Sequence, residues 1–311
     1  MRILITGGAG FIGSHIADAC LAAGHEVSII DDLSTGRREN VPADARFFEG
    51  DIRNAQWLAA TVRECRPEVV SHQAAQTSVA ISAREPVLDA DINVLGTLNL
   101  LNACVSQEVS NVVFASTGGA IYGEVPEGQR AQLDWQPQPL SPYACSKFAV
   151  EGYLGCYRAE HGLASTVLRY SNVYGPRQDP HGEAGVVAIF SQRAFAGQPL
   201  NVYARVEEGD AGCIRDYVFV DDVVRANLMA VDGGFDQPVV NVCTGEASST
   251  LDLAKAIKQH AQSKCEIGFG PRRPGDIERS VLDPGSPPPL GETVSLEDGL
   301  QQTVAWFGEH S

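Results

Sequence analysis

Residues 2–15 read RILITGGAGFIGSH, an apolar run that stops at a cluster of glycines. The run has the composition of a buried strand, and a helical pattern follows it. Three glycines share the spacing G-x-x-G-x-x-G between these two elements: Gly7, Gly10 and Gly13. Glycine permits a tight turn and a close approach of backbone to ligand, and a helix N-terminus attracts anions. The context predicts a dinucleotide pyrophosphate site, with a purely structural glycine turn as the alternative.

Asp31 ends the next strand-like run, Glu26–Ile30, 18 residues after Gly13. A carboxylate at this place accepts hydrogen bonds from the ribose hydroxyls of adenosine and repels a 2′-phosphate, which predicts NAD rather than NADP. Arg37 and Arg38 could hold a 2′-phosphate, but Asp31 occupies the deciding position.

Strand-like and helical runs alternate along the first half of the chain. The further strands are expected at Arg46–Phe48, Glu68–His72, Asn111–Ser116 and Ser165–Tyr170, and helices at Ile12–Ala23, Asp89–Val105 and Ser146–Glu160. This alternation predicts an α/β fold, a doubly wound parallel Rossmann sheet with helices on both faces.

The pattern changes after Tyr170. Loops are expected at 175–185 and 204–216, and a Pro/Gly-rich stretch at 270–291. Helices are expected near Val186–Ala196, Thr250–Gln262 and Leu296–Phe307. Strand and helix patterns return at Val218–Val231 and Val239–Thr244. We therefore expect a smaller, discontinuous C-terminal substrate domain. The predicted division is 1–174 with 216–248 for the cofactor, and 175–215 with 249–311 for the substrate.

Composition excludes several partners. The formal net charge of −16 argues against nucleic acid and against an anionic membrane. No apolar run reaches the ~18 residues of a membrane helix, and the glycine-interrupted N-terminus is unlike a signal peptide. The eight scattered cysteines lack metal-ligand spacing, so no metal is expected. Reduced thiols predict a cytoplasmic protein.

A tyrosine and a lysine stand four residues apart in Ser141-Pro-Tyr143-Ala-Cys-Ser-Lys147. On a helix, positions i and i+4 share one face, so the two side chains point into the same pocket. A free tyrosine has a pKa of ~10, too high for a base at neutral pH. A nearby cation lowers this value, so the pair predicts a tyrosine base assisted by lysine.

Taken together, these motifs give the chain a family likeness. It resembles the extended short-chain dehydrogenases/reductases, specifically the UDP-galactose (UDP-glucose) 4-epimerases of the NAD-dependent epimerase/dehydratase family. The matching segments occur in the expected order and cover nearly the whole chain: TGGAGFIGSH, DDLSTGRREN, DIRN, HQAA, NVLGTLNLL, FAST, IYGE, SPYACSK, LRYSNVYGPRQ, RDYVFVDDV, NVCTGE, RPGDIERS and LEDGL.

The resemblance implies roles for individual residues. Tyr143 would be the base, Lys147 would anchor the nicotinamide ribose, and Tyr170 would lie near the nicotinamide. Further NAD contacts are implied at Phe11, Ile12, Asp32, Asp51, Ile52, Ala74 and Ala75. UDP contacts are implied at Asn172, Arg215, Arg273 and Asp276. The alternatives are a turn or cap at Asp51 and at Asn172, pairing of Arg215 with Asp216 or a loop acid, and pairing of Arg273 with Asp276 or Glu278.

Two segments depart from the family pattern. The segment from Ser116 to Tyr122 is one residue longer than usual, which leaves Thr117 as the nearest hydroxyl for the proton relay. The usual L-G-W-x-P is reduced to Leu290-Gly291-Glu292, after PGSPPP. In resembling enzymes, the position seven residues after the second UDP-binding arginine gates the 2-substituent of the sugar. Here it is Ser280, so the expected pocket admits N-acetyl sugars.

The expected reaction is epimerisation at C4 of a UDP-hexose through a 4-keto intermediate with bound NAD, interconverting UDP-glucose and UDP-galactose. One alternative is a 4,6-dehydratase or uronate decarboxylase; similar dehydratases carry Asp-Glu after the catalytic Thr, where this chain has Gly118-Gly119. A second alternative is a non-catalytic NAD-binding interaction protein, which would not need both Tyr143 and Lys147. The helices Asp89–Val105 and Ser146–Glu160 resemble those that pair in dimers of the family, so a homodimer is expected.

Overall fold

The structure is a computed structural model that describes residues 1–180, 185–273 and 275–310. Residues 181–184 of the expected loop 175–185, and residue 274 of the expected stretch 270–291, lie outside the described residues. The chain divides into two compact units, each made of several segments. Unit 1 comprises Met1–Thr117, Ser141–Arg169 and Val224–Val240, and unit 2 comprises Gly118–Leu140, Tyr170–Val223 and Asn241–Ser311. The predicted division into cofactor and substrate domains concerns ligands and stays a prediction.

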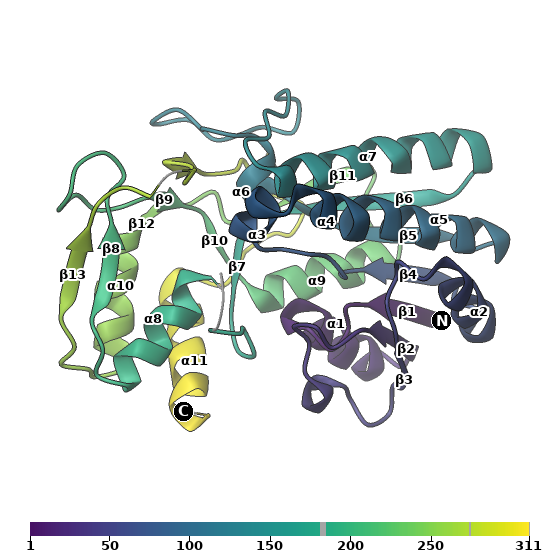
Figure 1. Ribbon diagram of the computed structural model, residues 1–311, viewed down its shortest axis with the longest axis horizontal. Coiled ribbons are helices and arrows are strands. Elements are labelled where there is room, and N and C mark those ends of the chain that lie inside the picture. Colours follow the sequence, from purple (N-terminus) through teal and green to yellow (C-terminus); the bar gives the residue numbers. More distant parts are fainter. Residues whose placement is uncertain (181–184, 274, 311) are drawn as a thin grey trace. The chain divides into compact units, whose positions relative to one another are not determined.

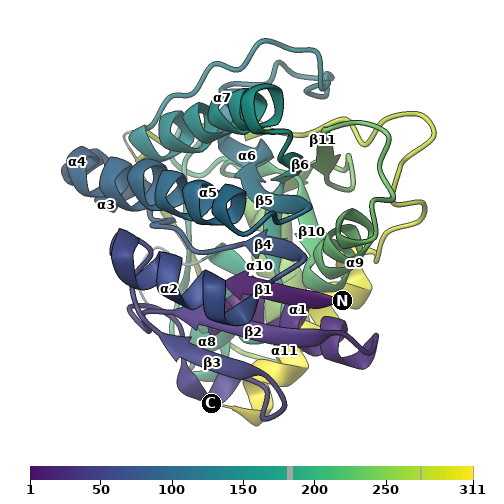
Figure 2. The same ribbon diagram turned by 90° about the vertical axis from the view of Figure 1, so that its right-hand side faces the viewer.

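A seven-stranded sheet forms the centre of unit 1, in the order β11-β6-β5-β4-β1-β2-β3 (Figures 1 and 2). Its strands are β1 (Arg2–Thr6), β2 (Glu26–Asp31), β3 (Arg46–Glu49), β4 (Val69–His72), β5 (Asn111–Thr117), β6 (Ala164–Tyr170) and β11 (Val239–Val242). In the parallel register of β1, Ile5 lies opposite Ile29 of β2 and Ser71 of β4. The predicted parallel Rossmann-type α/β sheet is confirmed.

Helices cover both faces of this sheet. They are α1 (Phe11–Ala22), α2 (Ala55–Cys65), α3 (Val79–Arg84), α4 (Pro86–Ala90), the π-helix η2 (Asp91–Gly96), α5 (Thr97–Ser106), α7 (Pro142–His161) and α9 (Val220–Val231), with a short 3-10 turn η1 (Arg38–Asn40). Figure 2 shows α2, α5 and α7 on one face and α1 and α9 on the other. Because both faces are covered, Ile3, Leu4 and Ile5 of β1 are almost completely buried, which explains the uninterrupted apolar run at the start of the chain.

Unit 2 contains short strands and three packed helices. The strands form pairs or triplets: β10 (Tyr217–Phe219) with β7 (Asn172–Tyr174), β13 (Ile267–Gly270) with β8 (Leu200–Tyr203), and β9 (Ile214–Arg215) between β12 (Ser248–Ser249) and β14 (Arg279–Ser280). The helices α8 (Val186–Phe195), α10 (Thr250–His260) and α11 (Leu296–Glu309) pack on one another, and α6 (Gly118–Ile121) is a single turn.

The structure corrects three sequence expectations. The helix carrying the Tyr-Lys motif begins at Pro142, not Ser146, because Ser141 caps it by accepting a hydrogen bond from the Ala144 N–H at 3.2 Å. The helix expected at Asp89–Val105 begins three residues earlier, at Pro86, and is continuous to Ser106, with the π-helix η2 between α4 and α5. The loop expected at 204–216 contains the two-residue strand β9, and the Pro/Gly-rich stretch 270–291 contains the two-residue strand β14; both strands are too short to produce a periodic pattern.

Within the described residues, no helix is both long enough and apolar enough to cross a membrane. The same residues contain no group of three or more His, Cys, Asp or Glu side chains that could hold a metal ion. All eight cysteines are unpaired, and six of them are buried.

Candidate active site

The glycine turn between β1 and α1 is shaped by close backbone contacts in unit 1. Gly7 has a φ of +70°, and a Cβ there would lie 2.6 Å from the backbone N of Ala74. A Cβ on Gly13 would collide with the Gly7 carbonyl oxygen. The turn is therefore bare backbone leading into the N-terminus of α1, where Gly10 at the cap position provides no side chain. Bare N–H groups at a helix N-terminus fit a pyrophosphate.

Asp31 lies at the end of β2 and is buried. Its Oδ2 accepts a hydrogen bond from the Ala9 N–H and its Oδ1 accepts one from the Leu33 N–H, both at 2.9 Å. Burial raises the pKa of this carboxyl, and the two backbone hydrogen bonds oppose the rise. Asp31 thus fastens the glycine turn to β2, and its contact with a ribose stays a prediction.

The neighbouring polar side chains of this loop have partners of their own. The exposed Asp32 accepts hydrogen bonds from the N–H and the hydroxyl of Ser34. The Arg37 guanidinium lies 3.5 Å from Glu39, and that of Arg38 lies 4.4 Å from the centre of the Phe47 ring. Both arginines, the alternative holders of a 2′-phosphate, therefore contact other residues of unit 1: Arg37 contacts Glu39 and Arg38 contacts Phe47 of β3.

Asp51 forms an ion pair with Arg53, whose Nε lies 2.8 Å from Oδ2. The hydrogen bond from Arg53 holds the pKa of Asp51 below its usual range. Asp51 Oδ1 also accepts from the Arg53 N–H at 2.8 Å, the turn geometry that was the alternative to an adenine contact. Ile52 is buried. Ala74 and Ala75 follow shortly after β4, and the backbone of Ala74 packs against Gly7. The NAD contacts of these residues, and of Phe11 and Ile12, stay predictions.

The Tyr-Lys motif occupies the first two turns of α7. Lys147 is buried, and its Nζ donates a hydrogen bond to the Ala115 carbonyl oxygen of β5 at 3.0 Å. The same Nζ lies 4.9 Å from the centre of the Phe114 ring. Tyr143, four residues earlier, shares this face of the helix. The ammonium is therefore fixed against β5 rather than free in solvent.

Thr117 is the last residue of β5, and its side chain is close enough to the Tyr143 phenol to lower the pKa of that group. Thr117 is itself buried. The helical turn α6 begins at Gly118, directly after Thr117. Unit 1 thus contains all three predicted catalytic residues, Thr117, Tyr143 and Lys147.

The expected lowering of the tyrosine pKa is wrong for this structure. Burial raises the pKa of Tyr143 to about 12; the Thr117 side chain opposes this rise, and the negative charge of Asp89 adds to it. Burial also lowers the pKa of Lys147 to about 8, against the effect of Asp89. Desolvation of the phenolate outweighs the effect that a nearby cation was expected to have.

Asp89, a buried carboxylate on α4 that acts on both members of the pair, was not predicted from the sequence. Only its charge in a helix of otherwise apolar residues could have drawn attention to it.

In unit 2, Asn172 of β7 donates a hydrogen bond from Nδ2 to the Asp216 carbonyl oxygen at 3.1 Å. Arg215 donates from its guanidinium to the Ile214 carbonyl oxygen at 3.0 Å. The Asp216 carboxylate accepts hydrogen bonds from the backbone of three residues, Thr244, Gly245 and Leu282, and from the Thr244 hydroxyl. The Asp216 carboxylate therefore binds mainly backbone N–H groups, and the alternative in which it pairs with Arg215 is not seen in the described residues.

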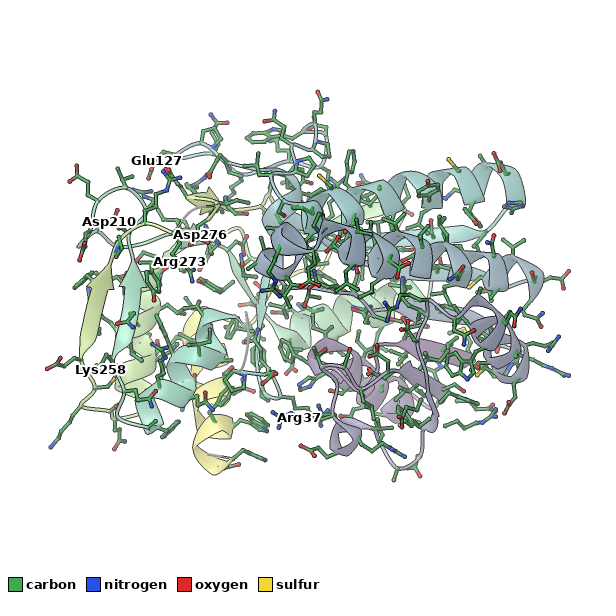
Figure 3. All side chains as sticks on the ribbon, in the orientation of Figure 1. Arg37, Glu127, Asp210, Lys258, Arg273 and Asp276 are labelled. Carbon is green, nitrogen blue, oxygen red and sulfur yellow. The ribbon has the colours of Figure 1, made fainter. Side chains whose placement is uncertain are left out.

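Arg273 forms an ion pair with Asp276, with Nε and Oδ2 2.9 Å apart (Figure 3). Its guanidinium also lies 4.7 Å from the centre of the Tyr203 ring, and its side chain is 59% exposed. The alternative pairing with Asp276 is thus present in this structure, while Glu278 pairs with Arg272 at 2.8 Å. Arg273 remains on the surface, where an anion can reach it.

The remaining predicted residues of unit 2 are buried. Tyr170 ends β6, and Ser280 lies in β14 beside β9. Ser248 of β12, which was not predicted from the sequence, is in register with Arg215 on the other side of β9. Two-residue strands leave no pattern from which this pairing could be predicted.

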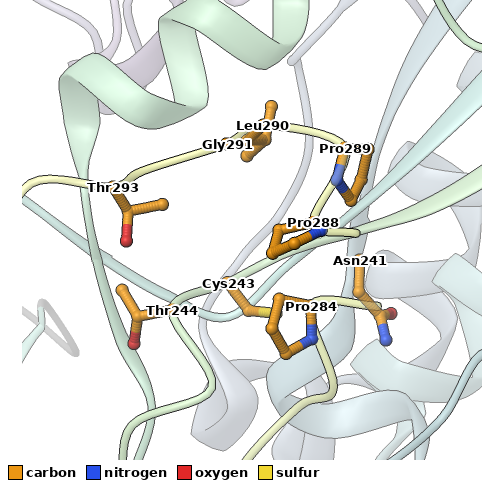
Figure 4. Close-up of a pocket in the computed structure, with 9 residues that line it drawn as sticks. All are labelled: Asn241, Cys243, Thr244, Pro284, Pro288, Pro289, Leu290, Gly291 and Thr293. Carbon is orange, nitrogen blue, oxygen red and sulfur yellow. The ribbon is translucent and has the colours of Figure 1, made fainter. Parts of the chain in front are cut away.

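A small pocket in unit 2 lies along the abridged segment near the end of the chain (Figure 4). It is lined by Asn241, Cys243, Thr244, Pro284, Pro288, Pro289, Leu290, Gly291 and Thr293. None of the predicted site residues lines it, so it carries no role in the predicted chemistry.

The model of the NAD dependent epimerase/dehydratase family matches residues 3–243. The chain belongs to this family. The match begins in β1 and includes the glycine turn, Thr117, Tyr143 and Lys147, so the family's sequence pattern and the cluster in unit 1 coincide.

Several UDP-glucose 4-epimerases match the chain from end to end. The UDP-glucose 4-epimerase of Mycolicibacterium smegmatis is 43% identical, and the match covers all of both chains. The crystal structure of the UDP-glucose 4-epimerase of Thermus thermophilus in complex with NAD is 51% identical, with a TM-score of 0.96 and full coverage of both chains. That of the Thermotoga maritima UDP-glucose 4-epimerase with UDP-glucose is 45% identical, with a TM-score of 0.93, and covers 100% of this chain and 99% of that one.

Proposed function

We propose that this protein is an NAD-dependent UDP-hexose 4-epimerase that interconverts UDP-glucose and UDP-galactose. The observation that carries the proposal is the cluster of Thr117, Tyr143 and Lys147 at the start of α7, in a chain similar over its full length to UDP-glucose 4-epimerases. Removing a hydroxyl proton at C4 requires one positioned base, and the phenol of Tyr143 is the group of this cluster suited to that role.

The glycine turn and Asp31 are the residues that would hold NAD. Gly7, Gly10 and Gly13 keep the turn before α1 free of side chains, so that a pyrophosphate can approach the N-terminus of this helix, and Asp31 offers its carboxylate to the ribose hydroxyls. When bound, NAD supplies a hydride acceptor that can return the hydride, so that the net reaction consumes no cofactor.

Tyr143 takes the proton from the C4 hydroxyl and gives it back when the sugar has been inverted. Its pKa of about 12 in the protein alone is too high for this task at neutral pH. The Thr117 side chain lowers this pKa. The Lys147 ammonium, on the same helix face, is proposed to favour the phenolate as well. Lys147 also anchors the nicotinamide ribose, with its position set by the Ala115 carbonyl.

Asn172, Arg215, Arg273 and Asp276 are proposed to bind the UDP moiety. A chain with a net charge of −16 needs local positive groups to hold a diphosphate, and the planar guanidinium of arginine matches phosphate oxygens. Arg273 is exposed, and Asp276 already orients it in the protein alone.

A homodimer is also proposed, formed through α4, η2 and α7. These helices expose large apolar side chains on unit 1: Val87 (81% exposed), Leu95 (54%), Tyr153 (41%) and Phe148 (39%). Apolar side chains grouped on adjacent helices indicate an interaction surface. Val87→Glu should shift the protein from dimer to monomer in sedimentation, whereas Val206→Glu, at an exposed position of unit 2, should not. We also propose the cytoplasm as its compartment, which the eight unpaired thiols support.

A coupled assay of the purified protein over a panel of UDP-hexoses tests the function. Tyr143→Phe should fold and bind NAD but lose nearly all turnover, because the proton acceptor is gone while the ring remains. A Tyr143→Phe protein with wild-type turnover would refute the assigned base. A 4-keto-6-deoxy product would instead indicate a dehydratase, which the absence of a carboxylate at Gly118-Gly119 disfavours.

A further inference from the structure

Asp89 is a buried carboxylate of which only one oxygen accepts hydrogen bonds. Its Oδ2 accepts hydrogen bonds from Gln76 Nε2 at 2.9 Å and from Asn93 Nδ2 at 3.1 Å. Its Oδ1 is buried and has no hydrogen-bond partner among the described residues. Burying an unpaired carboxylate oxygen destabilises the folded state. A role in the chemistry of the site would explain such a group in the core.

The hydrogen bonds continue from Asp89 to the backbone of the catalytic tyrosine. Asn93 Nδ2 also lies 3.1 Å from Ser146 Oγ, and the Ser146 hydroxyl donates to the Tyr143 carbonyl oxygen at 2.9 Å. Gln76 completes the network, because its backbone N–H donates a hydrogen bond to Asn93 Oδ1 at 2.8 Å. Asp89 is therefore linked through side chains to the first turn of α7.

The charge of Asp89 also acts on both members of the Tyr143–Lys147 pair. It opposes the desolvation that lowers the pKa of Lys147 and adds to the desolvation that raises the pKa of Tyr143. His72 of β4, another titratable group near Lys147, has a pKa of about 3 because it is buried, with a smaller contribution from the Lys147 charge, and stays neutral. The charged groups on the neighbouring elements are paired with other residues. Arg84 pairs with Glu85 and Asp91 with Arg53, both pairs exposed. Glu151 of α7 is buried and pairs with Arg169 of β6.

We propose that Asp89 is a positioning residue of the catalytic pair, which orients the first turn of α7 through Asn93 and Ser146 and supplies the fixed negative charge that keeps Lys147 an ammonium. The inference rests on the proposed function, in which Tyr143 is the base. It assigns Asp89 no contact with the substrate. Asp89 instead affects the pH values at which Tyr143 and Lys147 gain or lose their protons.

The test is the pH dependence of the NAD-loaded enzyme with Asp89→Asn, a substitution of equal size that keeps an acceptor oxygen. Removing the negative charge favours loss of the proton from both groups. The acidic and alkaline limbs of the turnover profile belong to the Tyr143–Lys147 pair as a whole, and both should therefore move to lower pH, by about half a unit or more. The titration of the tyrosinate, followed by ultraviolet difference spectroscopy against Tyr143→Phe, should move in the same direction without any need for turnover.

Two variants separate charge from position. Asp91→Asn removes an exposed carboxylate two residues away and should leave both limbs in place. Ser146→Ala breaks the link to the Tyr143 backbone and should lower kcat without moving either limb, because the charge of Asp89 remains. Thermal unfolding of each variant checks that the fold is retained.

The outcomes distinguish this inference from the proposed function. If Asp89→Asn lowers turnover but leaves the limbs and the tyrosinate titration unmoved, Asp89 is only structural and the inference is wrong. If Asp89→Asn does not fold, an unchanged kcat in Ser146→Ala would by itself remove the positioning role. If Tyr143→Phe keeps wild-type turnover, Tyr143 is not the base and the proposed function loses its support, whatever the pH profile of Asp89→Asn shows.

Discussion

Ser280 of β14 lies directly opposite Arg215 of β9 in the parallel register of these two strands. Ser248 of β12 occupies the corresponding place on the other side of Arg215. Side chains in register on neighbouring strands lie on the same face of a sheet, so Arg215 stands between two small hydroxyl residues. A large side chain at position 280 would take space beside the guanidinium that is proposed to hold a phosphate.

Ser280→Tyr should suppress turnover of UDP-N-acetylglucosamine and UDP-N-acetylgalactosamine and spare UDP-galactose, because the ring would fill the room for an acetamido group. The measurement is kcat/KM for each sugar. Wild-type enzyme should convert at least one N-acetyl sugar. Ser280→Ala is the control, since it removes the hydroxyl without adding bulk and should keep the wild-type preference. Conversion of UDP-galactose but of neither N-acetyl sugar by the wild type would refute the gate.

Thr117→Ala should slow the chemical step by roughly ten- to a thousandfold, the range for one positioned proton-transfer partner. Since the Thr117 side chain lowers the pKa of Tyr143, its loss should also move the acidic limb of the turnover profile to higher pH. Single-turnover kinetics over pH measure both effects. Thr117→Ser keeps a hydroxyl and should retain most of the rate. An unchanged kcat in Thr117→Ala would mean that another group, such as water, performs this role.

Asp31→Ala should relax the preference for NAD over NADP, because the ribose acceptor and the repulsion of a 2′-phosphate both disappear. It should also lower the free energy of unfolding by about 1–3 kcal/mol, since the N–H groups of Ala9 and Leu33 lose their partner. Asp31→Asn separates the two effects, because it removes the charge and keeps one acceptor. Calorimetric titration with each cofactor and urea unfolding are the measurements. A wild-type preference for NADP would overturn the assignment.

His72 should make the protein less stable in mild acid. Its Nδ1 lies 2.6 Å from Thr6 Oγ1 and its Nε2 lies 2.8 Å from Thr97 Oγ1, in the core of unit 1. Burial lowers its pKa from 6.5 to about 3, so between these values the unfolded chain binds a proton that the folded protein does not. This contribution to stability is present above pH ~6.5 and is lost towards pH 3, by about 1.4 kcal/mol per unit at most.

Urea unfolding of wild type and His72→Gln at pH 7 and pH 5 measures this effect. Gln can also form two hydrogen bonds but does not titrate, so the variant should lose less stability between the two pH values. Equal losses in both proteins would show that carboxylates alone produce the acid sensitivity.

Most of the elements of unit 1 could be predicted from the sequence. The strand Arg2–Thr6 was predicted with its observed bounds, and most other boundaries differ by one or two residues. These elements follow from local rules: a buried parallel strand is a continuous apolar run, and glycines separate it from the next helix. The start of α7 was missed by four residues because Pro142 and the Ser141 cap extend the helix beyond its periodic part.

The sequence by itself determined the glycine turn, the carboxylate at the end of β2 and the spacing of Tyr143 and Lys147, because each depends on residues close together in the chain. Tertiary structure alone decided the direction of the Tyr143 pKa, the Gln76–Asp89–Asn93–Ser146 network and the pairing of Arg215 with Ser280. The physical reason is that desolvation and strand register depend on groups that only folding brings together, and neither leaves a periodic trace in the sequence.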